Sequence, residues 1–144
     1  MENTATNECF RWPVRVYYED TDAAGVVYYA NYLKFFERCR TEWLRALGIE
    51  QRVLAATDGL QFVVADLALA YRRPARLDDE LIIEARITEL GRSFLVFVQE
   101  ARRAGEVLAT ATVKVACLDA VRFSPTRLPA GLVSALATLA QPSP

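Results

Sequence analysis

Two aspartates in one short loop are the residues of this sequence best placed to do chemistry. Asp20 and Asp22 precede Gly25 in the segment EDTDAAG, and an apolar pattern with helical spacing follows. The N–H groups at the start of a helix have no partner inside the helix, so they attract negative charge. A carboxylate loop that leads into a helix therefore predicts a site in which an acid or base faces backbone donors.

The chain has no histidine, and this absence limits the chemistry further. Ser-His-Asp and Cys-His nucleophile systems are excluded, as are the usual zinc sites. Three cysteines, Cys9, Cys39 and Cys117, lack paired metal spacing, and we interpret Cys39 and Cys117 as core residues. Proton transfer then falls to carboxylates, lysine, tyrosine, bound water or the backbone, and no metal or cofactor is expected.

Two simpler interpretations compete with catalysis at the aspartates. The spacing Asp20-x-Asp22-x-x-Gly25 resembles the opening of a calcium loop, but Ala24 occupies one ligand position and Asn31 replaces the bidentate glutamate. In the other interpretation, both aspartates only cap and turn the chain before the helix. The pattern alone supports that second interpretation as well as it supports catalysis.

The elements that must position the loop can be read from hydrophobic spacing. One face of a long helix is formed by Tyr32, Phe36, Cys39, Trp43 and Leu47. This helix is expected to follow the loop at 20–25 directly, to be buried on every side near its start, and to stop at Gly48. Shorter helices are predicted at 49–57 and 130–140.

Five strand patterns accompany the long helix, at residues 14–19, 62–71, 81–87, 94–100 and 107–117. Alternation at every second residue predicts one core face on each strand, which includes Leu67 in the second, Leu81 in the third and Val96 in the fourth. Turns at 90–93 and 103–106 predict antiparallel hairpins. The strands therefore form an antiparallel sheet.

The order of elements predicts an α+β fold, with an antiparallel five-stranded sheet wrapped around a long central helix. A chain of 144 residues fits one domain, 1–144, in which residues 1–12 and about 125–144 are expected to be peripheral. Such a sheet leaves its outer face and edges in need of partners, so a homodimer or homotetramer is expected.

Charge and hydropathy indicate where in the cell the protein is expected and which classes of partner are not. The net charge of −1 gives no electrostatic reason to expect nucleic acid as a partner. No apolar run approaches the roughly 18 residues that a membrane span requires, and the segment MENTATNECF lacks the features of a secretory signal. A soluble cytoplasmic protein without a membrane span is expected.

The loop and helix resemble those of a known family. The segment YEDTDAAGVVY at 18–28, with NY at 31–32 and FER at 36–38, is similar to the signature of hotdog-fold acyl-CoA thioesterases of the 4-hydroxybenzoyl-CoA thioesterase type. Within that type the segment is closest to the thioesterases associated with the bacterial Tol-Pal system. Supporting similarity lies in YRRPA at 71–75, in Asp79 and in LGRS at 90–93. The resemblance covers roughly residues 12–118 and implies the hotdog fold.

The resemblance also implies a catalytic site. Asp22 matches the family's catalytic aspartate, which acts as base or nucleophile, and the backbone N–H of Tyr29 matches the oxyanion donor. Many Tol-Pal-associated members have histidine where this chain has Tyr29, so the backbone donor is kept but an imidazole is not. Asp20 is interpreted as a residue that forms the loop.

Binding residues follow from the same resemblance. Glu37 is expected to line the substrate pocket, and Arg92 and Ser93 to bind the phosphates of coenzyme A. Three further arginines, at 72, 73 and 76, are candidates for the same task, and the sequence gives no basis for choosing among them.

The leading hypothesis is an enzyme that hydrolyses acyl-CoA, or acyl-carrier-protein, thioesters to a free acid and a thiol. Negative charge gathers on the carbonyl oxygen during attack, and the stable thiolate leaves without a strong acid, so a site with only a carboxylate suffices. A hotdog hydratase or dehydratase is disfavoured because those sites use histidine. The change at Tyr29 leaves open a non-catalytic module that binds acyl-CoA or acyl carrier protein. A structural partner of the envelope machinery is the weakest alternative.

Overall fold

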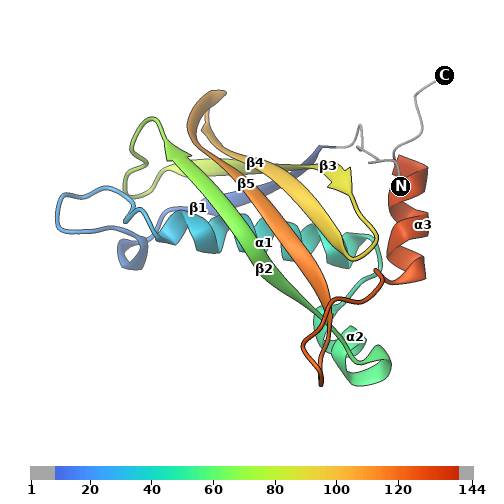
Figure 1. Ribbon diagram of the computed structural model, residues 1–144. Coiled ribbons are helices and arrows are strands. Elements are labelled where there is room, and N and C mark those ends of the chain that lie inside the picture. The colour runs from blue at the N-terminus through green and yellow to red at the C-terminus, as the bar shows by residue number, and fades with distance from the viewer. Residues whose placement is uncertain (1–8, 140–144) are drawn as a thin grey trace.

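The computed structural model describes residues 9–139. Within them the chain forms β1 (Phe10–Arg15), a 3₁₀ turn (Tyr18–Asp20), α1 (Asn31–Ala46), α2 (Gln51–Asp58), β2 (Leu60–Tyr71), β3 (Glu80–Leu90), β4 (Phe94–Arg103), β5 (Glu106–Asp119) and α3 (Ala130–Leu139). The strands form one sheet in the order β1-β3-β4-β5-β2, and every neighbouring pair is antiparallel (Figure 1). The predicted antiparallel five-stranded sheet is confirmed.

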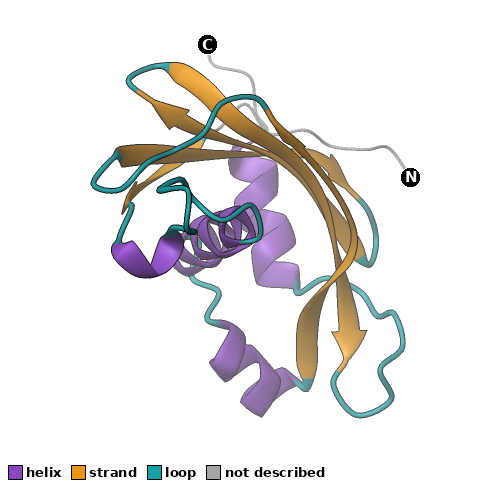
Figure 2. Cartoon of the chain, turned by 90° about the vertical axis from the view of Figure 1, so that its left-hand side faces the viewer, coloured by secondary structure: helices purple, strands orange, loops and turns teal. Residues whose placement is uncertain are grey.

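The sheet curves around α1, as Figure 2 shows. The predicted face of α1 is buried from Tyr32 through Trp43, and Leu47 packs partly buried against the same core. On β3, the predicted face is buried from Leu81 through Ile87. Burial of these apolar side chains is the main favourable term that holds the sheet on the helix.

The start of α1 differs from the prediction. The helix begins at Asn31 and not directly after Gly25. Val27 N–H donates to the carbonyl of Ala75 at 2.8 Å, and Tyr28 N–H donates to the carbonyl of Asp20 at 2.9 Å. These non-local hydrogen bonds replace the local ones that a helix would make, so the segment before Asn31 is a loop.

The first strand begins earlier than predicted. β1 starts at Phe10, and the Phe10 ring stacks on Trp43 of α1 with ring centroids 5.9 Å apart. The expectation that residues up to Trp12 are peripheral is therefore wrong for 10–12, because these residues form a sheet edge against the helix. Residues 1–8 lie outside the described residues.

The predicted core face is wrong in part for β2 and wrong for β4. In β2 a bulge between Val64 and Asp66 breaks the alternation, and Leu67 is 40% exposed, whereas Leu69 of the predicted face packs partly buried against the core. In β4 the buried face carries Leu95 and Phe97, whereas Val96 is only half-buried. Both faces of β4 are rich in apolar residues, so alternation alone could not tell them apart.

The C-terminal segment is not peripheral as expected. α3 occupies the predicted position, and its Leu132 and Leu136 are fully buried in the main core. Leu128, before the helix, is buried with them, and its N–H donates to the carbonyl of Arg92 at 3.0 Å. Ala140 and the residues after it lie outside the described residues.

Candidate active site

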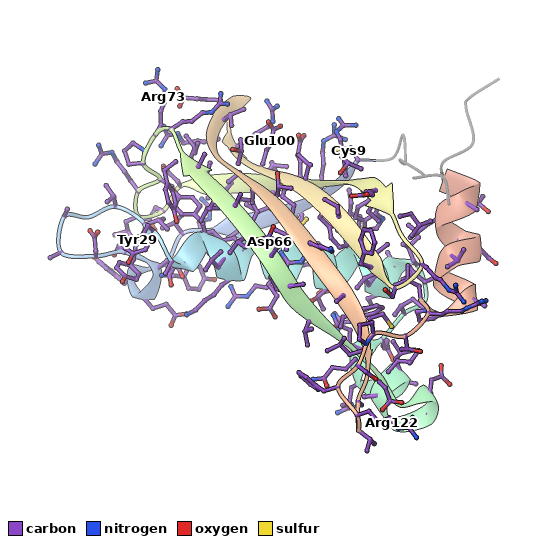
Figure 3. The ribbon with its side chains drawn as sticks, viewed as in Figure 1. Cys9, Tyr29, Asp66, Arg73, Glu100 and Arg122 are labelled. Carbon is purple, nitrogen blue, oxygen red and sulfur yellow. The ribbon has the colours of Figure 1, made fainter. Side chains whose placement is uncertain are left out.

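Asp22 and Tyr29 line the same pocket, which has a volume of about 340 Å³. Tyr32 of α1, Tyr71 at the end of β2 and Arg73 also line it. Figure 3 shows Tyr29 in the loop before α1 and Arg73 near the end of β2. The pocket therefore lies at the end of the sheet where the central helix begins.

A tight turn fixes the backbone and one carboxylate oxygen of Asp22. Its N–H donates to the carbonyl of Val26 at 2.9 Å, and its carbonyl accepts from Gly25 N–H at 3.0 Å. The left-handed φ of +80° at Gly25 closes this turn. Ala24 N–H donates to Asp22 Oδ1 at 2.8 Å. Oδ2 accepts no hydrogen bond from residues 9–139, so it is available to water or substrate.

The second group of interest is the backbone N–H of Tyr29, a residue that lines the same pocket as Asp22. Tyr29 precedes Ala30, the N-cap of α1, so its N–H lies next to the first helical turn and not within it. The N–H groups of Val27 and Tyr28 are occupied, whereas no group in the described part of the chain accepts a hydrogen bond from Tyr29 N–H. The nearby positive end of the helix favours an anion at this point.

Tyrosines surround the Tyr29 backbone. The hydroxyl of Tyr71 donates to the Tyr29 carbonyl oxygen at 2.8 Å, and the Tyr32 hydroxyl accepts from Ala75 N–H at 3.2 Å. Desolvation by burial raises the pKa of both Tyr71 and Tyr32 above the usual value of 10.0. Both hydroxyls therefore stay protonated, and each can donate a hydrogen bond at neutral pH.

Asp20 has the structural task that the sequence predicted. Its side chain is buried, and Oδ2 accepts the Tyr17 N–H at 2.9 Å. Its carbonyl accepts from Tyr28 N–H at 2.9 Å and from Asn31 Nδ2 at 2.9 Å. Asp20 thus ties the loop to the first residue of α1, and its interpretation as a residue that forms the loop is confirmed.

Glu37 does not lie in the Asp22 pocket of the same chain. It lines a second pocket of about 170 Å³ between α1 and the sheet, with Phe62 and Phe97 on the sheet side. Nearby, Arg40 donates to Oε1 of the buried Gln99 at 2.9 Å. A single chain therefore keeps Glu37 apart from the proposed reacting groups.

Arg92 and Ser93 lie at the opposite end of the sheet. They form the turn between β3 and β4, and the carbonyl of Ser93 accepts from Cys117 N–H at 2.8 Å. Cys117 pairs with Phe62 near the start of β2, whereas the Asp22 pocket adjoins Tyr71 at the end of that strand. Within one chain these two residues are not brought to the site.

The structure selects among the remaining arginines. Arg72 and Arg73 line the Asp22 pocket, whereas Arg76 does not. Arg73 forms a salt bridge with Glu106 at 3.0 Å, whereas the Arg72 side chain forms no salt bridge or hydrogen bond within residues 9–139. In the sequence, both arginines belong to the YRRPA segment at 71–75, which is part of the family resemblance.

Residues 9–139 contain neither a metal site of clustered side chains nor a helix that could span a membrane. No group of three or more Cys, Asp or Glu side chains there is arranged to hold a metal ion. No helix in that range is long and apolar enough to cross a membrane.

A curved antiparallel sheet around one helix, with a pocket at the start of that helix, defines a hotdog-fold protein. A crystal structure of a probable thioesterase from Bartonella henselae shares this fold, with a TM-score of 0.81 and 38% identity over 85% of this chain and 100% of that one. A 1,4-dihydroxy-2-naphthoyl-CoA thioesterase from Synechocystis shares the fold with a TM-score of 0.86 at 23% identity, over 94% of this chain and 100% of that one.

Sequence comparison assigns the family. Residues 24–110 match the Thioesterase superfamily, and the chain belongs to that family. It is 49% identical to the acyl-CoA thioesterase YbgC of Haemophilus influenzae over 83% of this chain and 88% of that protein. It is 48% identical to the acyl-CoA thioester hydrolase YbgC of Escherichia coli O6:H1 over 87% of this chain and 93% of that protein. The resemblance to acyl-CoA thioesterases is confirmed, and the Tol-Pal association stays a prediction.

Proposed function

We propose that the protein hydrolyses acyl-CoA thioesters in the pocket that Asp22 and Tyr29 share. The observation that carries this proposal is one pocket lined by a carboxylate with a free oxygen and by a residue with a free N–H. The names of the relatives from H. influenzae and E. coli, which match most of the chain, support the same reaction.

The two groups act on opposite sides of the thioester carbonyl. Tyr29 N–H donates to the carbonyl oxygen as it becomes an anion, and one such donor contributes about 3 kcal/mol to the transition state. Asp22 Oδ2 either removes a proton from the attacking water or attacks the carbonyl carbon itself. In the first route water adds to the carbonyl carbon and the thiolate leaves; in the second the thiolate leaves a mixed anhydride on Asp22, which water then hydrolyses. Both routes release the acid and the thiol of coenzyme A, and neither needs a histidine.

We further propose that a second copy of the chain pairs along β2. β2 is an edge strand, and its Val64, Leu67 and Tyr71 are 50%, 40% and 45% exposed. Exposed apolar edge strands invite pairing with another strand. A two-fold axis at this edge gives an antiparallel pair, the same arrangement as in the rest of the sheet.

Such a dimer accounts for the binding residues that one chain keeps apart. Antiparallel pairing lays the Leu60 end of one β2 beside the Tyr71 end of the other. The turn with Arg92 and Ser93 lies at the Leu60 end of the sheet, as does the pocket that Glu37 lines. The second copy would therefore present these residues on the side of the first copy's Asp22. Arginines suit the phosphates of coenzyme A.

An acyl carrier protein is proposed as a second source of substrate, because its thioester has the same pantetheine arm as acyl-CoA. The pocket holds the acyl end of that arm in both cases. Comparison of matched acyl-CoA and acyl-carrier-protein substrates measures which one is preferred.

The test is thiol release from straight-chain acyl-CoAs of increasing length and from benzoyl-CoA. Wild type is compared with Asp22→Asn, which keeps the size of the side chain and removes its basicity. A loss of about 10²–10⁴-fold in kcat is expected for that variant. Asp58→Asn, at the end of α2 and outside the pocket, is the matched control and should retain full activity.

Two results would count against the proposal. Full activity of Asp22→Asn would remove Asp22 from the reaction. Tight binding of acyl-CoA without thiol release from any substrate would instead identify a binding module.

A further inference from the structure

The side chain of Tyr71 links the sheet to the loop that carries Tyr29. Its hydroxyl donates to the Tyr29 carbonyl oxygen at 2.8 Å, across 42 positions in the sequence. Its ring lies edge-on to the Tyr29 ring with centroids 6.2 Å apart, and its centroid lies 5.5 Å from that of Tyr32. Tyr71 also lines the pocket that contains Asp22.

Other contacts fix the neighbouring peptides of this loop but not the one that Tyr71 holds. Tyr28 N–H donates to Asp20, and Asn31 N–H donates to the Tyr28 carbonyl at 2.8 Å. Within residues 9–139, the Tyr29 carbonyl accepts a hydrogen bond from Tyr71 alone. The orientation of the Tyr29–Ala30 peptide therefore depends on one hydroxyl from a distant strand.

The orientation of this peptide matters for anion stabilisation. Donors that already point at the developing charge stabilise it without reorganising. If the Tyr29–Ala30 peptide turned over, its carbonyl oxygen would bring partial negative charge towards the substrate oxygen and oppose the Tyr29 N–H, which belongs to the preceding peptide. A hydrogen bond to the carbonyl prevents this rotation. Burial raises the pKa of Tyr71 above its usual value, so its hydroxyl keeps the proton that it donates to a higher pH than an ordinary tyrosine would.

We propose that Tyr71 is a positioning residue of the active site, whose hydroxyl holds the Tyr29 carbonyl oxygen in place and so keeps it from turning towards the thioester oxygen that the Tyr29 N–H binds. This inference rests on the proposed hydrolysis and adds a residue of β2 to a site otherwise built from the loop before α1. Tyr71 does not contact the reacting atoms. It acts through Tyr29, so its contribution appears in the transition state and not in substrate binding.

Tyr71→Phe tests this assignment because it removes the hydroxyl and keeps the ring. We expect kcat to fall about tenfold, which corresponds to about 1.4 kcal/mol, and KM to stay within about twofold. The pH profile of kcat should keep its shape, because Asp22 is unchanged. Tyr18→Phe is the matched control, since Tyr18 is 80% exposed and lies outside this pocket.

A second variant separates positioning from packing. Replacement of Tyr71 with 4-aminophenylalanine restores a donor at the same place and should recover most of kcat, whereas phenylalanine should not. Unchanged kcat in Tyr71→Phe would overturn the assignment. A fall in melting temperature and a rise in KM, without rescue by the amine, would show that Tyr71 only packs. A shift of the alkaline limb of the pH profile would make Tyr71 a proton donor instead.

Failure of the proposed function itself gives a different result. In that case wild type releases no thiol from any acyl-CoA, and both proposals fall together. If wild type is active and depends on Asp22, the outcome for Tyr71 stands by itself.

Discussion

The two aspartates of the loop should separate stability from activity. Asp20 is buried and accepts the Tyr17 N–H at 2.9 Å. Asp20→Ala leaves that N–H unpaired, and the loss of a hydrogen bond to a charged group costs about 2 kcal/mol. Asp22 is exposed, and its alanine variant loses only the contact with Ala24 N–H, so its cost should stay below about 1 kcal/mol.

These free energies predict a measurable shift of the melting temperature, Tm. Unfolding entropy is about 2.1 cal/mol/K per residue, so for 144 residues each kcal/mol lowers Tm by about 3 °C. Asp20→Ala should therefore melt about 7 °C below wild type, and Asp22→Ala within about 3 °C of it. Asp20→Asn keeps an acceptor oxygen for the Tyr17 N–H, so its Tm should fall by about half as much as that of Asp20→Ala.

The assay is thermal unfolding by circular dichroism, with kcat measured well below the lower Tm. Asp20→Ala should retain much of its kcat there, and Asp22→Ala should lose nearly all of it. The reasoning is refuted if Asp20→Ala melts with wild type, or if both variants lose activity equally while folded.

Three further predictions concern the edge strand, a buried amide and a buried thiol. Lysines at Val64 and Leu67 should convert the proposed dimer to monomer in light scattering, whereas lysine at the similarly exposed Val53 of α2 should not. Equal masses for all variants would exclude pairing along β2. Gln99→Leu leaves the Arg40 guanidinium and the Phe36 carbonyl of α1 without their hydrogen-bond partner. It should lower the free energy of unfolding, measured in urea, by about 2 kcal/mol. An unchanged midpoint and slope would contradict this. Burial raises the pKa of the Cys39 thiol to about 12, so iodoacetamide at pH 8 should modify Cys39 only after unfolding. Alkylation of Cys39 in the native protein, detected by peptide mass mapping, would show that the thiol is accessible.

Local patterns predicted most of the fold. The face of α1 from Tyr32 to Trp43 and the alternation of β3 were readable because their periods are set by neighbours in sequence. The stop at Gly48, whose φ is +88°, was readable because few other residues adopt that conformation. The errors lie where a distant partner decides the structure.

The start of α1 shows how a distant partner overrides a local pattern. The apolar run after Gly25 fits a buried helix, but the carbonyls of Asp20 and Ala75 take the N–H groups of Tyr28 and Val27. No spacing in the sequence announces those bonds. In β4, the polar Gln99 lies on the buried face because Arg40 and the Phe36 carbonyl of α1 both bond to it.

The residues of the candidate site also fall into two groups, those that a local motif predicted and those that only the folded chain brings in. Asp22 and Tyr29 lie seven residues apart in one loop, so a single motif predicted them together. Tyr71 and Arg72 come from the end of β2, and only the closure of the sheet brings them to the same pocket. Arg92, Ser93 and Glu37 were placed by family resemblance, and in one chain they lie elsewhere, so their proposed roles depend on assembly.

The exposure of Asp22 supplies a physical reason for that dependence. In one chain the carboxylate lies in solvent, where water screens it from the carbonyl and weakens the hydrogen bond from Tyr29 N–H. Exclusion of water strengthens both interactions. Antiparallel pairing along β2 would cover the open side of the pocket and exclude water there. On this proposal the apolar side chains at Val64 and Leu67 would contribute to catalysis although neither lines the Asp22 pocket, and the lysine variants should lose kcat together with the proposed dimer.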